Sequence, residues 1–324
     1  MIRRLNMTDQ KPLFESPHFT LHHLAEGVYA AIAIPGGAAY SNAGIIDLGN
    51  QVLIFDAFDN PLAAADLRTA AQEITGKPPA WLINSHFHGD HTSGNMVFED
   101  CAILSTAYTR RKVAESAAEI EAMQRNPSEI EEMIRQEQQH IQEETDPERR
   151  KMMQNQISRW QYTLQTLPDL RLTLPNQTFD GKITFYGTSR QVELIAPGEA
   201  HTRGDCYLLL TEEKIIFTGD LCFFQIAPYM PGCNPAGWVQ QLEQFEAMDF
   251  EIFIPGHGPI GNKTDLARQR EYIQLVQHLA EQARQAGTPF ESLLAEPLPA
   301  PYDTWARASK RHENNLRYLY ENQK

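Results

Sequence analysis

The segment that decides the fold is SHFHGDHT at residues 85–92, in which three histidines and an aspartate fall within six residues. It follows the short apolar run AWLIN at residues 80–84, which has the composition and length of a strand. A single histidine is more often structural than metal-binding, but packing does not explain a group this dense. Zinc and iron favour imidazole and carboxylate ligands, and alternate residues of an extended turn can face opposite sides. The segment therefore predicts a site for two metal ions at the end of a strand.

The chain on either side of this segment reads as two β-rich halves. Residues 19–58 read as paired short strands separated by glycine-containing turns, and a helix follows at residues 61–74. Strands resume after Pro175 and are followed by a helix at residues 236–248 and a last strand at 251–255. Two β-rich halves flanked by helices, without a linker between them, predict one α/β domain whose two sheets pack face to face.

A helical block separates the two halves. After a strand at residues 102–105, residues 106–167 are rich in Glu, Gln, Ala, Arg and Met, which favour helix. Asn126-Pro127 and Asp146-Pro147 each place a capping residue before a proline, which predicts two helix starts and hence an αα-hairpin. Apolar residues recur at three- and four-residue spacing on both arms, at Ile130, Met133, Ile134 and Ile141 and at Met153, Ile157, Trp160, Leu164 and Leu167. We therefore expect a single domain over residues 1–324, with a helical insertion at about 106–167 and a C-terminal helical extension at about 264–324.

Three later motifs add further metal-ligand types in a fixed order. His201 lies in GEAHTRGD at residues 198–205, Asp220 in TGD at 218–220, and His257 in PGHG at 255–258. Together with HFHGDH, which is an HxHxDH pattern, these motifs resemble the metallo-β-lactamase superfamily over roughly residues 19–260. The resemblance implies a four-layer αββα sandwich that carries the helical block as an insertion.

The resemblance also implies a role for each of seven residues. His86, His88 and His201 would bind a first metal ion, and Asp90, His91 and His257 would bind a second. Asp220 would bridge the two ions. Asp90 and Asp220 are the candidate catalytic residues. Two divalent metal ions are expected, with zinc as the default from the ligand types and with iron or manganese left open.

Two divalent ions about 3.5–4 Å apart lower the pKa of a shared water and polarise the bond under attack. The sequence therefore favours a binuclear hydrolase that attacks a small ester, lactone, thioester or related substrate with a metal-bridged hydroxide. Many β-lactamases of the family have other residues at the position of Asp220, so antibiotic hydrolysis is not the first expectation. Two alternatives stay open, namely a mononuclear-iron oxidoreductase of the same fold and a metal-braced scaffold for protein interaction.

Other polar residues could support the site or form its walls. Asp56 and Asp205 are candidates to accept the second ring N–H of a ligating histidine, although Asp56 could equally cap a turn. Tyr40 and Tyr229 lie in loops expected beside the metals, where an aromatic residue more often forms a wall than stabilises an oxyanion. Five further histidines that match no motif are expected at the surface or in satisfied core positions, namely His22, His23, His140, His278 and His312.

The composition of the chain limits the kinds of partner and the compartment that we expect. Apolar residues make up 42% of the 324 residues, no run is long enough to span a membrane, and the N-terminal stretch lacks a secretory h-region. The net charge of -14 weighs against a nucleic-acid partner. We therefore expect a cytoplasmic protein with a small-molecule substrate and without a membrane partner, in which the insertion covers the site or forms a homodimer contact. The cysteines are expected as buried thiols, and they are Cys101, Cys206, Cys222 and Cys233.

Overall fold

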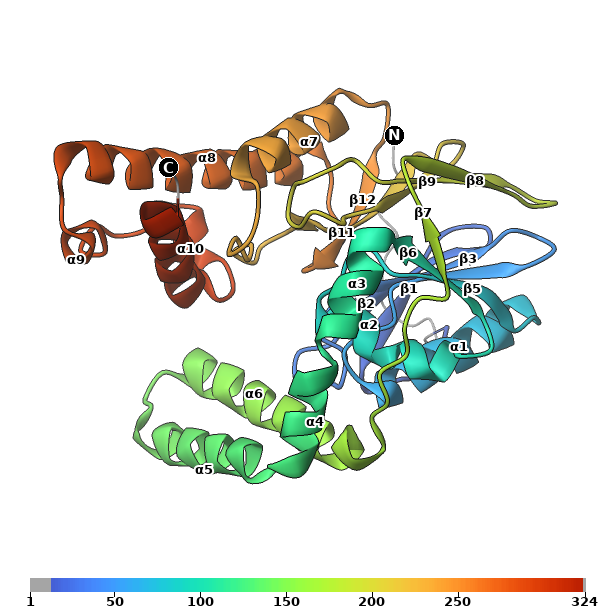
Figure 1. The fold of residues 1–324 in the computed structure, drawn as a ribbon, viewed down its shortest axis with the longest axis horizontal. Coiled ribbons are helices and arrows are strands. Elements are labelled where there is room, and N and C mark those ends of the chain that lie inside the picture. The colour runs from blue at the N-terminus through green and yellow to red at the C-terminus, as the bar shows by residue number, and fades with distance from the viewer. Residues whose placement is uncertain (1–12, 323–324) are drawn as a thin grey trace.

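The computed structural model describes residues 13–322, which form two β-sheets with helices on their outer faces (Figure 1). The basic start of the chain, where we expect no secretory signal, lies outside the described residues. The N-terminal sheet has the order β1-β2-β3-β4-β5-β6-β7, and the second sheet has the order β12-β11-β10-β9-β8. The strands of the first sheet are β1 (Phe19–Ala25), β2 (Val28–Ala33), β3 (Ala43–Asp47), β4 (Val52–Phe55), β5 (Pro79–Ile83), β6 (Ala102–Thr106) and β7 (Gln177–Phe179). Those of the second are β8 (Lys182–Tyr186), β9 (Gln191–Ile195), β10 (Tyr207–Leu210), β11 (Ile215–Phe223) and β12 (Ile252–His257).

The helices fall into three groups along the chain. Those of the first half are α1 (Pro61–Thr75), the short α2 (Gly89–Thr92) and the 3₁₀ helix η1 (Ser93–Phe98). Those of the insertion are α3 (Ala107–Glu115), α4 (Ala117–Arg125), α5 (Ser128–Glu143), α6 (Pro147–Thr166) and the 3₁₀ helix η2 (Leu167–Asp169). Those of the second half are α7 (Pro235–Ala247), α8 (Lys263–Ala286), α9 (Phe290–Leu293), the 3₁₀ helix η3 (Tyr302–Thr304) and α10 (Ala308–Asn322).

Three apolar layers hold the sheets and helices together. Along β4, Leu53 and Phe55 pack between the two sheets, whereas Val52 and Ile54 pack on the side of α1. This alternation follows from the two-residue period of a strand, which buries both faces when both are covered. On the far side, the second sheet packs against α7 and α8 around Trp238. The order of layers is therefore helix, sheet, sheet, helix, and the expected four-layer αββα sandwich is confirmed.

The insertion is helical as expected, but its internal breaks differ from the prediction. Asp146 caps α6 by accepting hydrogen bonds from the backbone N–H of Glu148 and Arg149, as predicted. Asn126 does not cap α5; its side chain contacts Glu129 and Ser128, and the helix begins after Pro127. A further break at Ser116 separates α3 from α4.

The predicted apolar faces of the two long insertion helices do pack together, around Ile130, Ile134 and Ile157. Met133 and Met153 are not part of this cluster, and the Met133 side chain is 40% exposed. We call α5 and α6 the helical arm, and Figure 1 shows it projecting away from the two sheets. The assignment of the whole chain to one domain stays a prediction.

The strand arrangement places several chain turns at one edge of the molecule. β4, β5 and β6 run parallel to one another, as do β11 and β12, so their carboxyl ends open toward the same region. Backbone hydrogen bonds connect the two halves there. The N–H of Asn42 donates to the carbonyl of Gly256, and the N–H of Cys206 donates to the carbonyl of Ser85. No helix within residues 13–322 is long and apolar enough to cross a membrane.

Candidate metal centre

All seven residues predicted as metal ligands come together at this edge. His86 and His88 lie in the turn after β5, and Asp90 and His91 lie on α2. The remaining three, His201, Asp220 and His257, come from the β9–β10 loop, from β11 and from the end of β12. Their ligand atoms form two adjoining groups, one of His86, His88, His201 and Asp220 and the other of Asp90, His91 and His257.

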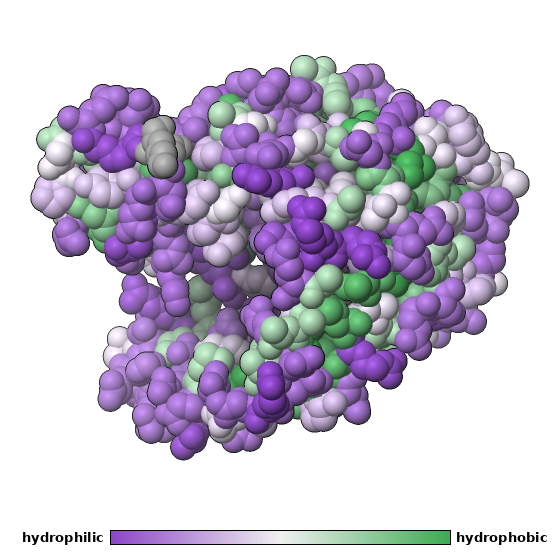
Figure 2. All heavy atoms as spheres, viewed as in Figure 1, coloured by the Kyte–Doolittle hydropathy of each residue, from purple (hydrophilic) through white to green (hydrophobic). Residues whose placement is uncertain are grey.

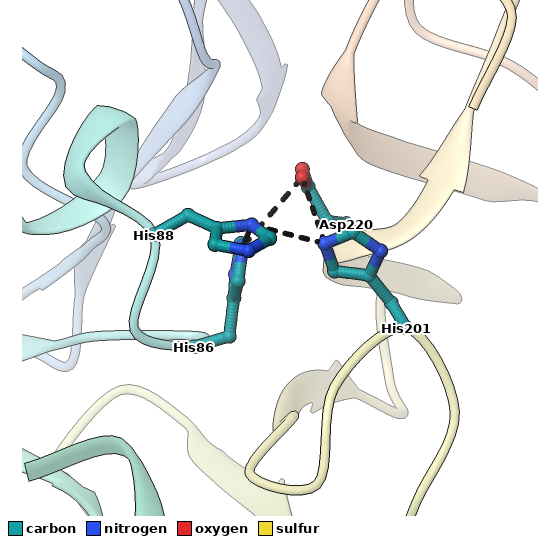
Figure 3. Close-up of side chains that lie close together, drawn as sticks. All are labelled: His86, His88, His201 and Asp220. Atoms are coloured by element: carbon teal, nitrogen blue, oxygen red, sulfur yellow. Dashed lines mark hydrogen bonds and ion pairs between the residues drawn. The ribbon is translucent and has the colours of Figure 1, made fainter. Parts of the chain in front are cut away.

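In the first group, three imidazoles and a carboxylate oxygen converge on one point (Figure 3). His88 Nδ1 lies 2.9 Å from His86 Nε2 and 3.1 Å from His201 Nε2. Asp220 Oδ2 lies 3.5 Å from His86 Nε2 and 3.4 Å from His201 Nε2. Three imidazole nitrogens and one carboxylate oxygen form a ligand set suited to a divalent metal ion.

In the second group, the other oxygen of Asp220 takes part. Asp220 Oδ1 lies 3.1 Å from His91 Nε2 and 3.3 Å from His257 Nε2. Asp90 Oδ2 lies 3.1 Å from His257 Nε2 and 3.8 Å from His91 Nε2. The carboxylate of Asp220 thus presents one oxygen to each group, which is the arrangement that a bridging ligand requires.

The unsatisfied polar atoms of the site fit a bound cation. Asp220 Oδ1 and His91 Nε2 are buried, and neither has a hydrogen bond among the described residues despite their short separation. Buried polar groups without partners are rare in folded proteins, and an ion between them would satisfy both. The donor set, the burial and the convergence of these atoms therefore fit a divalent metal.

The pKa shifts of the site residues also fit a bound cation. Burial lowers the pKa of His86 and His88, and lowers that of His201 to about 3, so these imidazoles are neutral with lone pairs free to bind metal. Burial alone would also lower the pKa of His91, but the carboxylates of Asp220, Asp56 and Asp90 outweigh it and raise the pKa. The carboxylates thus favour positive charge at the centre, which a metal cation would supply.

Three of the histidines are held in place through their second ring nitrogen. His91 Nδ1 lies 2.8 Å from Asp56 Oδ2, and Asp56 also accepts hydrogen bonds from the backbone N–H and the hydroxyl of Ser85. His257 Nδ1 lies 3.1 Å from the carbonyl oxygen of Tyr40. His86 Nδ1 lies 3.0 Å from the hydroxyl of Ser85. Asp56 therefore makes the expected contact with the second ring nitrogen of His91, a predicted metal ligand.

Asp205 does not have the role expected of it. Its carboxylate accepts hydrogen bonds from the backbone N–H and the hydroxyl of Thr202, and His201 Nδ1 has no hydrogen-bond partner among the described residues. Asp205 therefore fixes the turn that carries His201 and does not bind its ring. Burial raises the pKa of Asp205 to about 7.

Two glycines in the ligand motifs allow the close approach of the strands. A Cβ atom on Gly256 would overlap Asp220 Oδ1, and one on Gly219 would lie 2.5 Å from Cβ of Ser85. Gly219 also has a φ of +52°, a conformation that other residues rarely adopt. These positions explain why a glycine precedes the ligand in both TGD and PGHG.

The candidate centre opens into a cavity that is large enough for a small molecule. The volume of this cavity is about 430 Å³, and its walls include His88, Asp90 and His257 together with Tyr40 and Tyr229. The Tyr229 ring lies 5.9 Å from the ring of His88, and the Tyr40 ring lies 4.8 Å from that of His257. Both tyrosines therefore line the cavity beside the centre, and their role as walls stays a prediction.

Sequence reasoning missed three charged cavity residues, of which Asp59 lies between β4 and α1. Arg159 on α6 and Arg311 on α10 line the same cavity, although they lie far from the ligand motifs in the chain. Neither belongs to a motif, and a lone arginine on a helix is usually a solvated surface residue, so no local signal could have identified them.

The five further histidines singled out in the sequence, and the cysteines, lie outside the centre. His23, His140 and His278 are exposed, His22 is half-buried, and His312 is a buried residue next to the Tyr272 hydroxyl. All four cysteines are free buried thiols, as expected.

A comparison with known families matches this geometry. A family model described as the metallo-beta-lactamase superfamily matches residues 36–257, which is more than half of the chain. The chain belongs to the metallo-β-lactamase superfamily. Among solved structures, it is similar to a protein described as a metallo-beta-lactamase from Pontibacter korlensis, with a TM-score of 0.55 and 16% sequence identity. That match covers 79% of this chain and 99% of the other chain, and at this identity it concerns the fold alone.

Membership of the metallo-β-lactamase superfamily does not determine the reaction. Most members are metal-dependent hydrolases, but others are not hydrolases, and one fold can carry several chemistries. The His and Asp groups of this member suit divalent metal binding. Their roles as metal ligands, and the number and identity of the ions, stay predictions.

Proposed function

We propose that the protein is a binuclear metal-dependent hydrolase of small esters, lactones, thioesters or related acyl compounds. The observation that carries the proposal is the carboxylate of Asp220, which presents Oδ2 to the first ligand group and Oδ1 to the second. Seven N and O ligands exceed the four of a closed single zinc site. We expect zinc, with iron or manganese as the other ions that these ligand types accept.

The residues of the chain would act mainly by holding charge and geometry. Two divalent ions in this site would lower the pKa of a shared water and polarise the bond under attack. Asp220 would supply negative charge to both positions and fix their separation. Asp90 would complete the second position from the cavity side, where 21% of its side chain is exposed. Asp56 would keep the His91 ring oriented toward the centre.

Two alternatives have less support. A mononuclear-iron oxidoreductase would not need the second group, yet Asp90, His91 and His257 lie as close together as the residues of the first. A metal-braced interaction scaffold would be expected to enclose its ions, whereas this centre opens into a cavity large enough for a small substrate.

Metal content is the direct test of the binuclear proposal. We expect elemental analysis of metal-replete protein to find about two ions per chain, because both ligand groups are complete. Asp220→Ala should lower that content and reduce ester, lactone and thioester hydrolysis to the level of metal-depleted protein, as should His88→Ala. His278→Ala, which removes an exposed histidine from α8, is the matched control and should change neither. One ion or none in the metal-replete protein, with Asp220→Ala unchanged in content and turnover, would contradict the proposal.

A further inference from the structure

Three guanidinium groups gather around one tyrosine at the mouth of the cavity. The Arg159 guanidinium carbon lies 3.7 Å from the centre of the Tyr40 ring, and that of Arg307 lies 4.7 Å from it. Arg311 donates a hydrogen bond of 2.9 Å to the Tyr40 hydroxyl. We call Arg159, Arg307 and Arg311 the arginine cluster. It brings together the helical arm and the C-terminal extension, which are separate in sequence.

The arginine cluster lies one aromatic ring away from the candidate metal centre. The ring of Tyr40 lies 4.8 Å from that of His257. Arg311 also lies 5.6 Å from the centre of the Phe223 ring, which stacks on His257 at 5.0 Å. A small substrate with its reacting bond at the centre could therefore reach the cluster with its other end.

A second cavity lies next to the arginine cluster and enlarges the space through which a substrate could reach it. Arg159, Arg307 and Tyr40 also line a cavity of about 560 Å³ between the helical arm and the segment before α10. Figure 2 shows the surface hollowed between the arm and the C-terminal helices, with mostly hydrophilic residues around the opening. The cluster thus lies where two cavities meet.

The positive charge of the cluster is only partly compensated by the protein. Arg159 forms an ion pair with Asp59 at 2.9 Å. Among residues 13–322, Arg307 and Arg311 form no ion pair; their side chains donate to the neutral oxygens of Gln156, Ala227 and Tyr40. Burial lowers the pKa of Arg307, and the guanidinium groups of Arg311 and Arg159 lower it further, whereas Tyr40 and the Asp90 carboxylate act in the opposite direction without reversing the shift. Like charges this close are costly without a negative partner.

The backbone holds this costly arrangement in place. Arg307 has a φ of 59°, which residues other than glycine seldom adopt. The flanking Ala306 exchanges backbone hydrogen bonds with the loop after β11, donating to Gln225 and accepting from Ala227. Strained residues held by their surroundings occur mainly at functional sites.

We propose that the arginine cluster binds an oxyanion, either a carboxylate or a phosphate, carried by the substrate at the end away from the hydrolysed bond. Guanidinium groups match the geometry of both anions, and Arg311 makes two hydrogen bonds with the described residues out of five possible N–H donors. The substrate class is therefore an acidic acyl compound. This inference rests on the proposed function only in assigning the anion to a substrate.

The kinetic test compares each charged substrate with a neutral ester of the same acyl chain. Mono-4-nitrophenyl glutarate carries a carboxylate and is compared with its methyl ester, and 4-nitrophenyl phosphonoacetate carries a phosphonate and is compared with its dimethyl ester. We expect a higher kcat/KM for at least one charged compound than for its own neutral ester. Arg311→Gln and Arg307→Gln should each lower that ratio about tenfold or more, since a hydrogen bond to a charged group is being lost. Arg317→Gln, on the exposed face of α10, is the matched control and should leave the ratio unchanged.

A binding test separates this inference from the proposed hydrolysis. Metal-depleted protein is titrated calorimetrically with glutarate and with inorganic phosphate, so that metal ions cannot bind the anion. We expect one of the two to bind, with affinity reduced about tenfold in Arg311→Gln and Arg307→Gln but not in Arg317→Gln. The anion that binds more tightly identifies the charged group. Such binding without any ester turnover would remove the hydrolase proposal and leave the arginine cluster as an anion site.

Two outcomes would overturn the inference. One is an equal loss of kcat/KM for the charged and the methylated substrate in both arginine variants, which would mean that the cluster only positions Tyr40. The other is no arginine-dependent binding of either anion together with an unchanged substrate ratio. Circular dichroism of each variant shows whether a loss of activity or binding reflects unfolding. Arg311→Lys is the replacement that retains the charge.

Discussion

The Asp56 carboxylate connects the end of β4 to a predicted metal ligand. It lies 2.8 Å from His91 Nδ1 and accepts two hydrogen bonds from Ser85, which precedes His86. Its φ of 62° is unusual for a residue other than glycine, as is common for residues held in place at functional sites. One side chain thus supports ligands of both groups.

We therefore expect Asp56→Asn to weaken metal binding about 10- to 100-fold, the usual effect of losing a carboxylate that orients a ligand histidine. Competition with a chelator would measure the affinity. Asp100→Asn, which breaks an exposed pair with Arg68, is the control and should leave affinity unchanged. If Asp56→Asn also leaves affinity unchanged, the carboxylate serves only to fix the turn.

At the residue scale, the sequence predicted which histidines and aspartates gather better than it predicted their surroundings. The clustering of His86, His88 and Asp90 could be predicted because their spacing is local and follows a strand. Arg307 and Arg311 were not found, because only the packing of the C-terminal helices brings them beside Tyr40. Distant contacts of this kind leave no pattern in a single sequence.

At the scale of elements, the helical arm is fastened to the sheets through α6. The Asn60 side chain caps α1 and also donates to the Tyr162 carbonyl and the Thr166 hydroxyl. Arg159 reaches from the same helix into the cavity. Met152 lines the adjoining hollow, so the arm contributes an apolar side chain to its wall. Periodicity predicted the two helices, but their docking depends on these long-range contacts.

Replacing residues 126–167 with a short Gly/Ser linker should therefore raise KM or change substrate range or oligomeric state. Metal content should stay the same, because no predicted ligand lies in the replaced segment. Arg159→Gln in the intact arm is the companion variant and should reproduce the part of the kinetic change that comes from the cavity. Unchanged kinetics on small and large esters, with unchanged mass in solution, would leave the arm without a role in access.

The packing of α10 on α8 should depend on pH through His312. Burial lowers the pKa of this histidine to about 4, and the Tyr272 hydroxyl lies 3.2 Å from its Nδ1. Since the unfolded pKa is about 6.5, the unfolded chain takes up the proton first as the pH falls. The contribution of neutral His312 is thus complete above about pH 6.5 and is lost toward pH 4, by about 2 to 3 kcal/mol.

We expect urea unfolding between pH 7.5 and 4.5 to show a smaller loss of stability in His312→Gln than in the unchanged protein. Comparing the two removes the contribution of the other titrating groups, which both proteins share. His278→Gln, an exposed histidine on α8, should keep the original pH dependence. Equal pH dependence in all three proteins would show that His312 titrates alike in the folded and unfolded states.

At the scale of the whole molecule, the apolar layers do not depend on the candidate metal centre. One layer lies between the sheets, and one lies on the outer face of each. The ligands stand at strand ends, beyond these layers, so a chain of this size can fold without a metal. The alternating apolar pattern predicted the layers, because each strand alternates residues between its two faces.

Removing the metal ions should consequently lower the melting temperature without abolishing folding. An ion present at about 1,000 times its Kd stabilises the folded state by about 4 kcal/mol, which corresponds to a shift of roughly 5–10 °C for a chain of this size. Calorimetry of chelator-treated protein should show a cooperative transition at the lower temperature, and added zinc should restore the original one. Asp220→Ala should respond less to the chelator, because it lacks the ligand that both groups share. Loss of the cooperative transition in the metal-depleted protein would indicate that the ions are structural, and an unchanged melting temperature would indicate that the folded chain binds none.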